Sequence, residues 1–371
     1  MKSKPNDELR HDWRTSLQQR RGLKPSTIAA KLAALRDYEN FTDQRSFLKL
    51  NGEQVAAFKE HLLASPSRTT GERLSCSTVV HTLDHCRDFF GWLADRREGR
   101  HLDREGVSWF SATRADKERA RAVPPKPVPS LEEARAAFTS MQSDTLLNRR
   151  DRALFATLLL TAIRADALAS LPLGSVDSEN RSIWQDGRLV RTKNSRSFCV
   201  YFLPFVEEAY QTLKGWIAEL QGLGLLSSDA LFPRDVELLR IEAGDRPTPS
   251  EYPMWQGSTQ VRAIVRGAFT TAGLPAHSPH VFRHMFAKHV FALRPAAEEI
   301  IAFSINLGHK KLETTLNPYA RPDDETRARL IAELGGRSDV AGSIDMGALV
   351  KQLFTLDPAK AAKLFAELAR R

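Results

Sequence analysis

The sequence predicts a mainly α-helical chain with a small antiparallel β-sheet, divided into two domains. The length of 371 residues suits two domains. Apolar residues recur at helical spacing over most of the chain. Strand-like runs separated by turn residues occur together only between residues 181 and 203. We expect a helical N-terminal domain at 1–113, a basic, proline-rich linker at 114–129, a second, mixed α/β domain at 130–336 and a helical tail at 337–371.

The N-terminal domain should contain about four helices. Residues 1–24 are rich in charge, and we expect them to be irregular. A helix should begin at Ser26, which is a good N-cap residue, and a later one should be capped by Ser77. The apolar stripes of these helices, and of one between them, comprise Ile28, Leu32 and Leu35, then Val55, Phe58 and Leu62, then Val79, Leu83, Cys86, Phe90 and Leu93.

The second domain should begin with a capping box, Ser130-x-x-Glu133, after a linker that ends in four prolines. Helices follow through Leu168. The runs RSIW, GRLVRTK and SFCVYFL then predict strands joined by Asp-Gly and Asn-Ser turns. After Pro204 the pattern is helical to about residue 336, interrupted by an expected loop at 240–258.

The tail carries a second helical start signal, Asp357 followed by Pro358. Its apolar stripe is Leu364, Phe365 and Leu368. Such a helix packs either on its own domain or in a groove of a neighbouring copy, and the sequence leaves both open.

The net charge of +9 favours a polyanionic partner. No apolar run approaches the roughly 20 residues that cross a bilayer, and the N-terminus lacks the apolar core of a signal peptide. Three cysteines make no disulfide framework, which indicates a reducing compartment. We expect a cytoplasmic protein without a membrane partner.

Two histidine clusters resemble metal sites on first inspection. His81 and His85 lie four residues apart near Cys76 and Cys86, but Cys86 belongs to the apolar face of its helix. His280 and His284 lack the acidic residue of an H-E-x-x-H site. A polar helix face explains the first cluster better than zinc does, and we predict no metal and no cofactor.

The remaining basic residues suit metal-free cleavage of a phosphodiester. Such a reaction needs donors for the non-bridging oxygens, a proton for the leaving oxygen and a nucleophile. Arginine holds two oxygens at once and keeps its charge. Lysine or histidine can donate the proton, and tyrosine can store the bond as an ester. The sequence offers one ordered set for these tasks: Arg164, Lys193, His280, Arg283, His309 and Tyr319.

Tyr319 is the one tyrosine of five that follows the histidine–arginine cluster. It lies between Pro318 and Pro322, which makes a continuous helix there unfavourable. Taken alone, one tyrosine near a turn is better explained by surface packing. Lys193 is flanked by Arg191 and Arg196, so by pattern its assignment is the least secure of the six.

The ordered motifs resemble those of the tyrosine recombinase (phage integrase) family. They are TAIR ending in Arg164, RTKNSR with Lys193, HVFRH with His280 and Arg283, LGH ending in His309, and NPY ending in Tyr319. The resemblance covers about residues 130–325, and the N-terminal helices resemble the family's core-binding domain by pattern.

The resemblance implies a role for each residue. Arg164 and Arg283 would hold the scissile phosphate, and His309 would donate a hydrogen bond to it. Lys193 would protonate the leaving 5′ oxygen, and His280 would assist proton transfer. Tyr319 would form a 3′-phosphotyrosine.

Three departures from the family pattern bear on this site. Ala162 stands where the family usually has glycine, and Ala167 where it often has an acidic residue, with Asp166 as a candidate substitute. Tyr319 lies ten residues after His309, one more than is usual. The extra residue could reflect altered geometry or delivery to a neighbour's site.

The resemblance implies a site-specific DNA recombinase that clamps double-stranded DNA between two domains. It also implies a homotetramer on DNA, with accessory proteins or partner recombinases as further partners, acting at the bacterial nucleoid. Two rival interpretations remain: a DNA-binding regulator of the same fold that has lost activity, and a type IB topoisomerase-like enzyme that relaxes DNA without exchanging partners.

Overall fold

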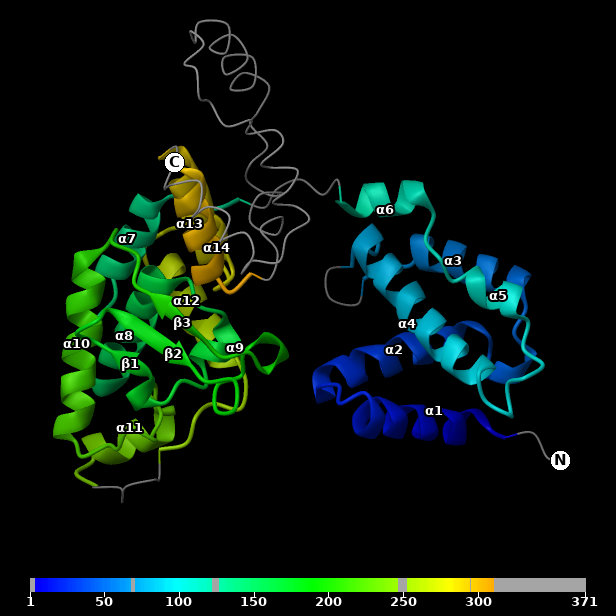
Figure 1. The fold of residues 1–371 in the computed structure, drawn as a ribbon, viewed down its shortest axis with the longest axis horizontal. Coiled ribbons are helices and arrows are strands. Elements are labelled where there is room, and N and C mark those ends of the chain that lie inside the picture. The colour runs from blue at the N-terminus through cyan, green and yellow to red at the C-terminus, as the bar shows by residue number, and fades with distance from the viewer. Residues whose placement is uncertain (1–3, 68–70, 122–126, 246–251, 294, 310–371) are drawn as a thin grey trace, which may run out of the picture. The chain divides into compact units, whose positions relative to one another are not determined.

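The fold is known from a computed structural model, which describes residues 4–67, 71–121, 127–245, 252–293 and 295–309. The chain divides into two compact units, residues 1–126 and 127–371. Helices dominate the described residues, and the one sheet is three-stranded and antiparallel (Figure 1). The predicted fold class is therefore confirmed.

All the named elements in the described part of the first unit are helices. Its core is aromatic: Tyr38 makes edge contacts with the rings of Phe58, Phe90 and Phe110. The elements are α1 (Asn6–Thr15), η1 (Ser16–Arg20), α2 (Pro25–Phe41), η2 (Phe47–Lys49), α3 (Gly52–Ala64), α4 (Cys76–Ala94), α5 (Arg104–Ser108) and α6 (Arg114–Arg121).

The expectation of an irregular N-terminus was wrong, because α1 and η1 occupy much of residues 6–20. Leu9, Trp13 and Leu17 are fully buried. They recur every four residues, so they form one apolar stripe that the many surrounding charges conceal in the sequence. The stripe packs in the core of the first unit.

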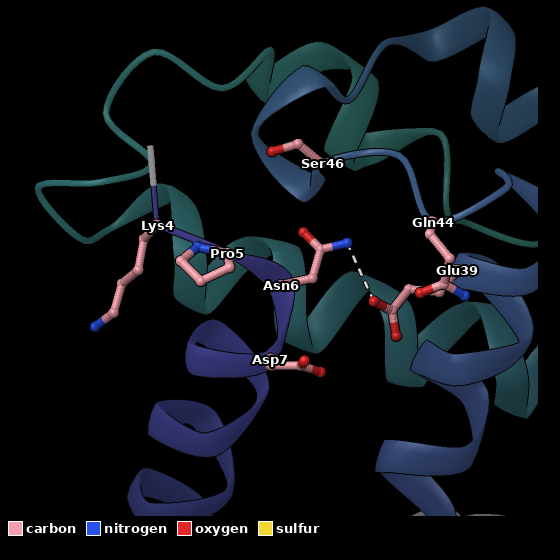
Figure 2. Close-up of a pocket in the computed structure, with 7 residues that line it drawn as sticks. All are labelled: Lys4, Pro5, Asn6, Asp7, Glu39, Gln44 and Ser46. Atoms are coloured by element: carbon pink, nitrogen blue, oxygen red, sulfur yellow. Dashed lines mark hydrogen bonds between the residues drawn. The ribbon is translucent and has the colours of Figure 1, made fainter. Parts of the chain in front are cut away.

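Polar contacts anchor the start of α1 on α2. Asn6 Nδ2 donates to Glu39 Oε1 at 3.1 Å, and Arg10 forms an ion pair with the same buried carboxylate. Asn6 Oδ1 accepts from the backbone N–H of Phe47 at 2.9 Å. Asn6 and Glu39 both line a small pocket of about 290 Å³, and Figure 2 shows the hydrogen bond between them. None of the predicted site residues lines it.

Three local boundaries differ from the predicted ones. α2 begins at Pro25 rather than Ser26, since proline fits the first helical position. Ser75, not Ser77, caps α4, and its Oγ accepts from the N–H of Thr78 at 3.1 Å. Residues 114–121, assigned to the linker, form α6, whose Asp116 pairs with Lys59 of α3 at 2.7 Å.

The second unit is organised around α8, which is buried along most of its length. Helices α7, α10, α11 and α12 contact it (Figure 1). The capping box of Ser130 and Glu133 opens α7 as predicted. The elements are α7 (Leu131–Thr139), α8 (Leu146–Thr161), α9 (Ala165–Leu168), η3 (Leu173–Ser175), β1 (Val176–Asp177), β2 (Ser182–Gln185), η4 (Lys193–Ser195), β3 (Phe198–Tyr201), α10 (Glu207–Gly222), α11 (Asp235–Glu242), α12 (Thr259–Thr271), α13 (Val281–Ala292) and α14 (Ala297–Asn306).

The sheet has the order β1-β2-β3, and Ile183 pairs with Val200 on its buried face. The run at 187–193, predicted as a strand, is instead a loop between β2 and β3. The backbone carbonyl of Asp186 accepts from Val190 at 2.7 Å, and Asn194 has a φ of 60°. Turn chemistry at Asp186 and Asn194 therefore overrides the strand propensity between them.

No helix within the described ranges is long and apolar enough to span a bilayer. The Pro318–Pro322 turn and the tail at 337–371 lie outside the described residues.

Candidate active site

Arg164 is placed by a break at the end of α8. Ala162 takes the left-handed conformation, with φ 48° and ψ 31°, and so ends the helix. That conformation costs a non-glycine residue on the order of 1 kcal/mol. The chain then turns, and Arg164 becomes the residue before α9. Among the described residues, no hydrogen bond or ion pair is made by its half-buried guanidinium.

Arg283 lies on α13 and is 4% exposed. Its Nη1 donates to the carbonyl oxygen of Ala162 at 2.9 Å. Its Nη2 donates to the carbonyl of Leu307 and lies 2.9 Å from His309 Nε2. One guanidinium thus joins three motifs that are more than 100 residues apart at their extremes. One of its two carbonyl partners belongs to the strained Ala162.

His309 follows a glycine that terminates α14. The N–H of Gly308 donates to Ile305 at 2.7 Å, and the N–H of His309 donates to Ser304 at 3.1 Å, which is a Schellman cap. Gly308 has a φ of 64°. A Cβ there would lie 2.6 Å from Phe198 Cζ and 3.4 Å from Arg164 Nη1. Both the turn and the close approach therefore require glycine in the LGH motif.

His280 precedes α13, and its ring lies 4.8 Å from that of His284. Burial lowers the pKa of His280 to about 4, with further lowering by the charges of His284, Arg283 and Arg164. Burial likewise lowers the pKa of His309 to about 4, assisted by Arg283, Arg164, His280 and Lys193. Both imidazoles are therefore neutral at neutral pH in the free protein. Arg164 and Arg283 act on both rings, and Lys193 and His280 act on His309, so five of the predicted residues influence one another's surroundings.

Lys193 lies on the exposed η4 turn between β2 and β3. Arg196, three residues later, acts on the site as well: after burial, its charge is what lowers the pKa of Arg164. The sequence prediction did not include Arg196 among the site residues. Its signal was the clustering of Arg191, Lys193 and Arg196 on one short loop.

Tyr319 lies outside the described residues. The structure brings together the other five of the six predicted residues.

Among the described residues, no group of three or more histidine, cysteine or acidic side chains could hold a metal ion. Cys86 is fully buried in α4, and its Sγ lies 3.5 Å from the carbonyl oxygen of Ala34.

The arrangement is suited to an anion. In the described part of the chain, no carboxylate forms an ion pair with Arg164, Lys193 or Arg196. Arg164 and Arg196 are partly buried cations without a described counter-ion; they repel one another and lose solvation, so a bound phosphate would relieve both costs. Guanidinium groups that converge on one place can hold two phosphate oxygens each.

Comparisons with known proteins place this fold. The chain is 26% identical to the tyrosine recombinase XerC of Roseiflexus castenholzii over 356 residues, covering 93% of this chain and 97% of that one. It matches the solved Tn1549 transposon integrase in complex with transposon right-end DNA with a TM-score of 0.59 and 17% identity, covering 88% of this chain and 99% of that one. It matches a lambda integrase tetramer bound to a Holliday junction with a TM-score of 0.57 and 14% identity, covering 87% and 80%.

The fold is thus the one found in solved DNA integrases. The phage integrase family model matches residues 131–326, more than half of the chain. The chain belongs to the phage integrase family.

Proposed function

We propose that the chain is a site-specific DNA recombinase that cleaves and rejoins strands through a 3′-phosphotyrosine at Tyr319. Family membership and the XerC relatives support DNA recombination as its function. The observation that carries the site assignment is the convergence of Arg164, Arg283 and Lys193 beside two neutral histidines, with no ion-paired carboxylate at Arg164 or Lys193 among the described residues.

Each residue then has a chemical task. The phenol oxygen of Tyr319 attacks phosphorus, and the bond from phosphorus to the 5′ oxygen breaks. Lys193 protonates that leaving oxygen, while His280 assists proton transfer from the phenol. Arg164, Arg283 and the imidazole of His309 stabilise the charge on the non-bridging oxygens. Attack by a 5′-hydroxyl of another strand reverses the steps and releases Tyr319, so rejoining consumes no nucleotide.

Arg283 is held in this site by three contacts. Two backbone carbonyls and His309 fix its guanidinium before substrate binds. A preformed donor needs no reorganisation when charge develops on the phosphate. Arg164, without such partners among the described residues, is the guanidinium that remains available to take both oxygens.

The partners follow as part of the same proposal. We expect double-stranded DNA to be bound by both units and four copies to assemble on two duplexes, as in the lambda integrase tetramer on a Holliday junction. We also expect accessory proteins or partner recombinases to take part. The protein should act in the cytoplasm at the bacterial nucleoid, and its tail could dock on a neighbouring copy. Binding should weaken steeply with salt, because phosphate contacts release counter-ions.

The test uses nicked, end-labelled DNA that carries the recombination site and traps the covalent intermediate. The wild-type protein should give a labelled adduct on a denaturing gel, whereas Tyr319→Phe should give none and bind the same DNA with similar affinity. An adduct that persists in Tyr319→Phe would reject Tyr319 as the nucleophile.

The same assay separates the two rivals. A regulator that has lost activity gives no adduct even with wild-type protein. A topoisomerase-like enzyme relaxes supercoiled DNA that lacks a defined target, whereas a site-specific recombinase requires the target sequence.

A further inference from the structure

Strand β3 lies at the outer edge of the sheet, where backbone groups ordinarily lack partners. At Tyr201 one side chain satisfies both of them. The N–H of Tyr201 donates to Asn306 Oδ1 at 2.7 Å, and Asn306 Nδ2 donates to the carbonyl of Tyr201 at 3.0 Å. A side-chain amide carries the same donor and acceptor as a peptide group. Asn306 therefore pairs with β3 as one residue of an added strand would.

This pairing links two motifs of the active site. Asn306 is the last residue of α14 and lies three positions before His309. At the other end of β3, the ring of Phe198 packs against Gly308. The short strand is thus held at both ends by the turn that carries His309.

The same strand continues from the loop that carries Lys193. Phe198 follows Lys193 by five residues, so a shift of β3 along or away from the turn would move the loop with it. Lys193 itself is exposed and has no described partner that could fix its position. Its placement near His309 must therefore come from the backbone.

We propose that Asn306 is a positioning residue that fixes the Lys193 loop relative to the His309 turn, so that the ammonium group reaches the leaving 5′ oxygen. The inference rests on the proposed function, in which Lys193 is the proton donor. A proton donor acts only from hydrogen-bond distance, about 2.6–3.2 Å. A loop that is free to drift by an ångström loses that distance.

The test compares two DNA substrates in single-turnover cleavage by the full-length protein. One is ordinary DNA, and the other has sulfur in place of the leaving 5′ oxygen at the scissile phosphate. A thiolate leaves without a proton, so the sulfur substrate does not need the donor. Asn306→Leu, which keeps the side-chain shape and removes both hydrogen bonds, should slow the oxygen substrate about tenfold or more and change the sulfur substrate less than about threefold. Lys193→Ala should show the same selectivity with a larger loss.

Three controls accompany it. Ile305→Ala alters the neighbouring residue, which is 49% exposed, and should affect neither substrate. Asn306→Asp keeps the acceptor for the Tyr201 N–H and lacks the donor, so its cleavage rate on the oxygen substrate should lie between those of the wild type and Asn306→Leu. Hydrogen exchange of the Tyr201 amide should be faster in Asn306→Leu than in the wild type, which reports on the pairing without any activity.

The outcomes are distinct. Equal losses on both substrates, unchanged cleavage of the oxygen substrate or unchanged exchange at Tyr201 would overturn the positioning role and leave the proposed function intact. Wild-type protein that cleaves neither substrate would refute the proposed function and the positioning role together. Lys193→Ala without preference for sulfur would refute Lys193 as the proton donor, and the positioning role with it, while leaving strand cleavage by Tyr319 intact.

Discussion

The two ends of helix α8 carry arginines in opposite situations. Near its start, Arg150 is 1% exposed and bonded to Asp151 Oδ1 at 2.7 and 2.8 Å, to Asp235 and to the carbonyl of Pro233 at 3.0 Å. Its guanidinium also lies 5.2 Å from the ring of Trp255. Just beyond the other end, Arg164 is half-buried and has no such partner among the described residues.

The difference separates an arginine of the fold from an arginine of the site. A buried cation with carboxylates and a carbonyl around it has its desolvation offset within the protein. A half-buried cation beside Arg196 has not, and burial together with that charge lowers the pKa of Arg164. The first arrangement holds α11 against α8, and the second leaves a place for the charge of a substrate.

The largest effect should come from Arg164→Ala. It removes a donor to the transition state, so single-turnover cleavage should fall by about 10²–10³. Thermal unfolding should change little, within about 0.5 kcal/mol, because no described bond is lost. Arg240→Ala, an exposed arginine of α11, is the matched control and should alter neither quantity. Near wild-type cleavage by Arg164→Ala would show that Arg164 does not act in the site.

Arg150→Met should do the reverse. It leaves the partly buried Asp151 without its partner, so the free energy of unfolding should fall by about 3 kcal/mol. Cleavage per folded molecule should stay near the wild-type value. Urea unfolding and active-site titration measure the two quantities. Adding Asp151→Asn should recover part of the stability, and a variant that stays fully stable would contradict the structural role.

A smaller effect on stability should appear on acidification, through the two histidines near Arg164. The pKa values of His280 and His309 lie at about 4 in the folded state, below the ordinary value of 6.5. Between these values the unfolded chain binds protons that the folded chain does not. The free energy of unfolding should therefore fall as the pH drops from about 6.5 to about 4. Its slope against pH corresponds to the uptake of less than one proton per imidazole on unfolding.

Unfolding in urea at several pH values measures this slope. His280→Gln and His309→Gln should each give a shallower dependence than the wild type, whereas Arg240→Ala, which changes an exposed arginine of α11, should keep the wild-type slope. Identical slopes in all four proteins would show that these imidazoles do not titrate as the structure indicates.

How much the sequence could predict depended on how local each signal was. The capping box at Ser130 and Glu133 was predicted correctly, because its residues contact one another within one turn. Helix α1 was missed, because the burial of Trp13 depends on packing against α2 and α4. The turns at Asp186 and Asn194 were expected, but the run at 187–193 between them was assigned to a strand, because side-chain propensity did not show that the N–H of Val190 would bond back to Asp186 and close the run into a loop.

The sequence by itself determined the family, the mainly helical class and the chemical types of the site residues, because each depends on residue identity and order. Only the tertiary structure decided which basic groups meet. It placed Arg283 on the carbonyls of Ala162 and Leu307, brought Arg196 near Arg164, and paired Asn306 with Tyr201 across 105 positions. The contacts of Arg283 and Asn306 join distant segments through backbone groups, which every residue carries, so the identity of the partner residue does not reveal them.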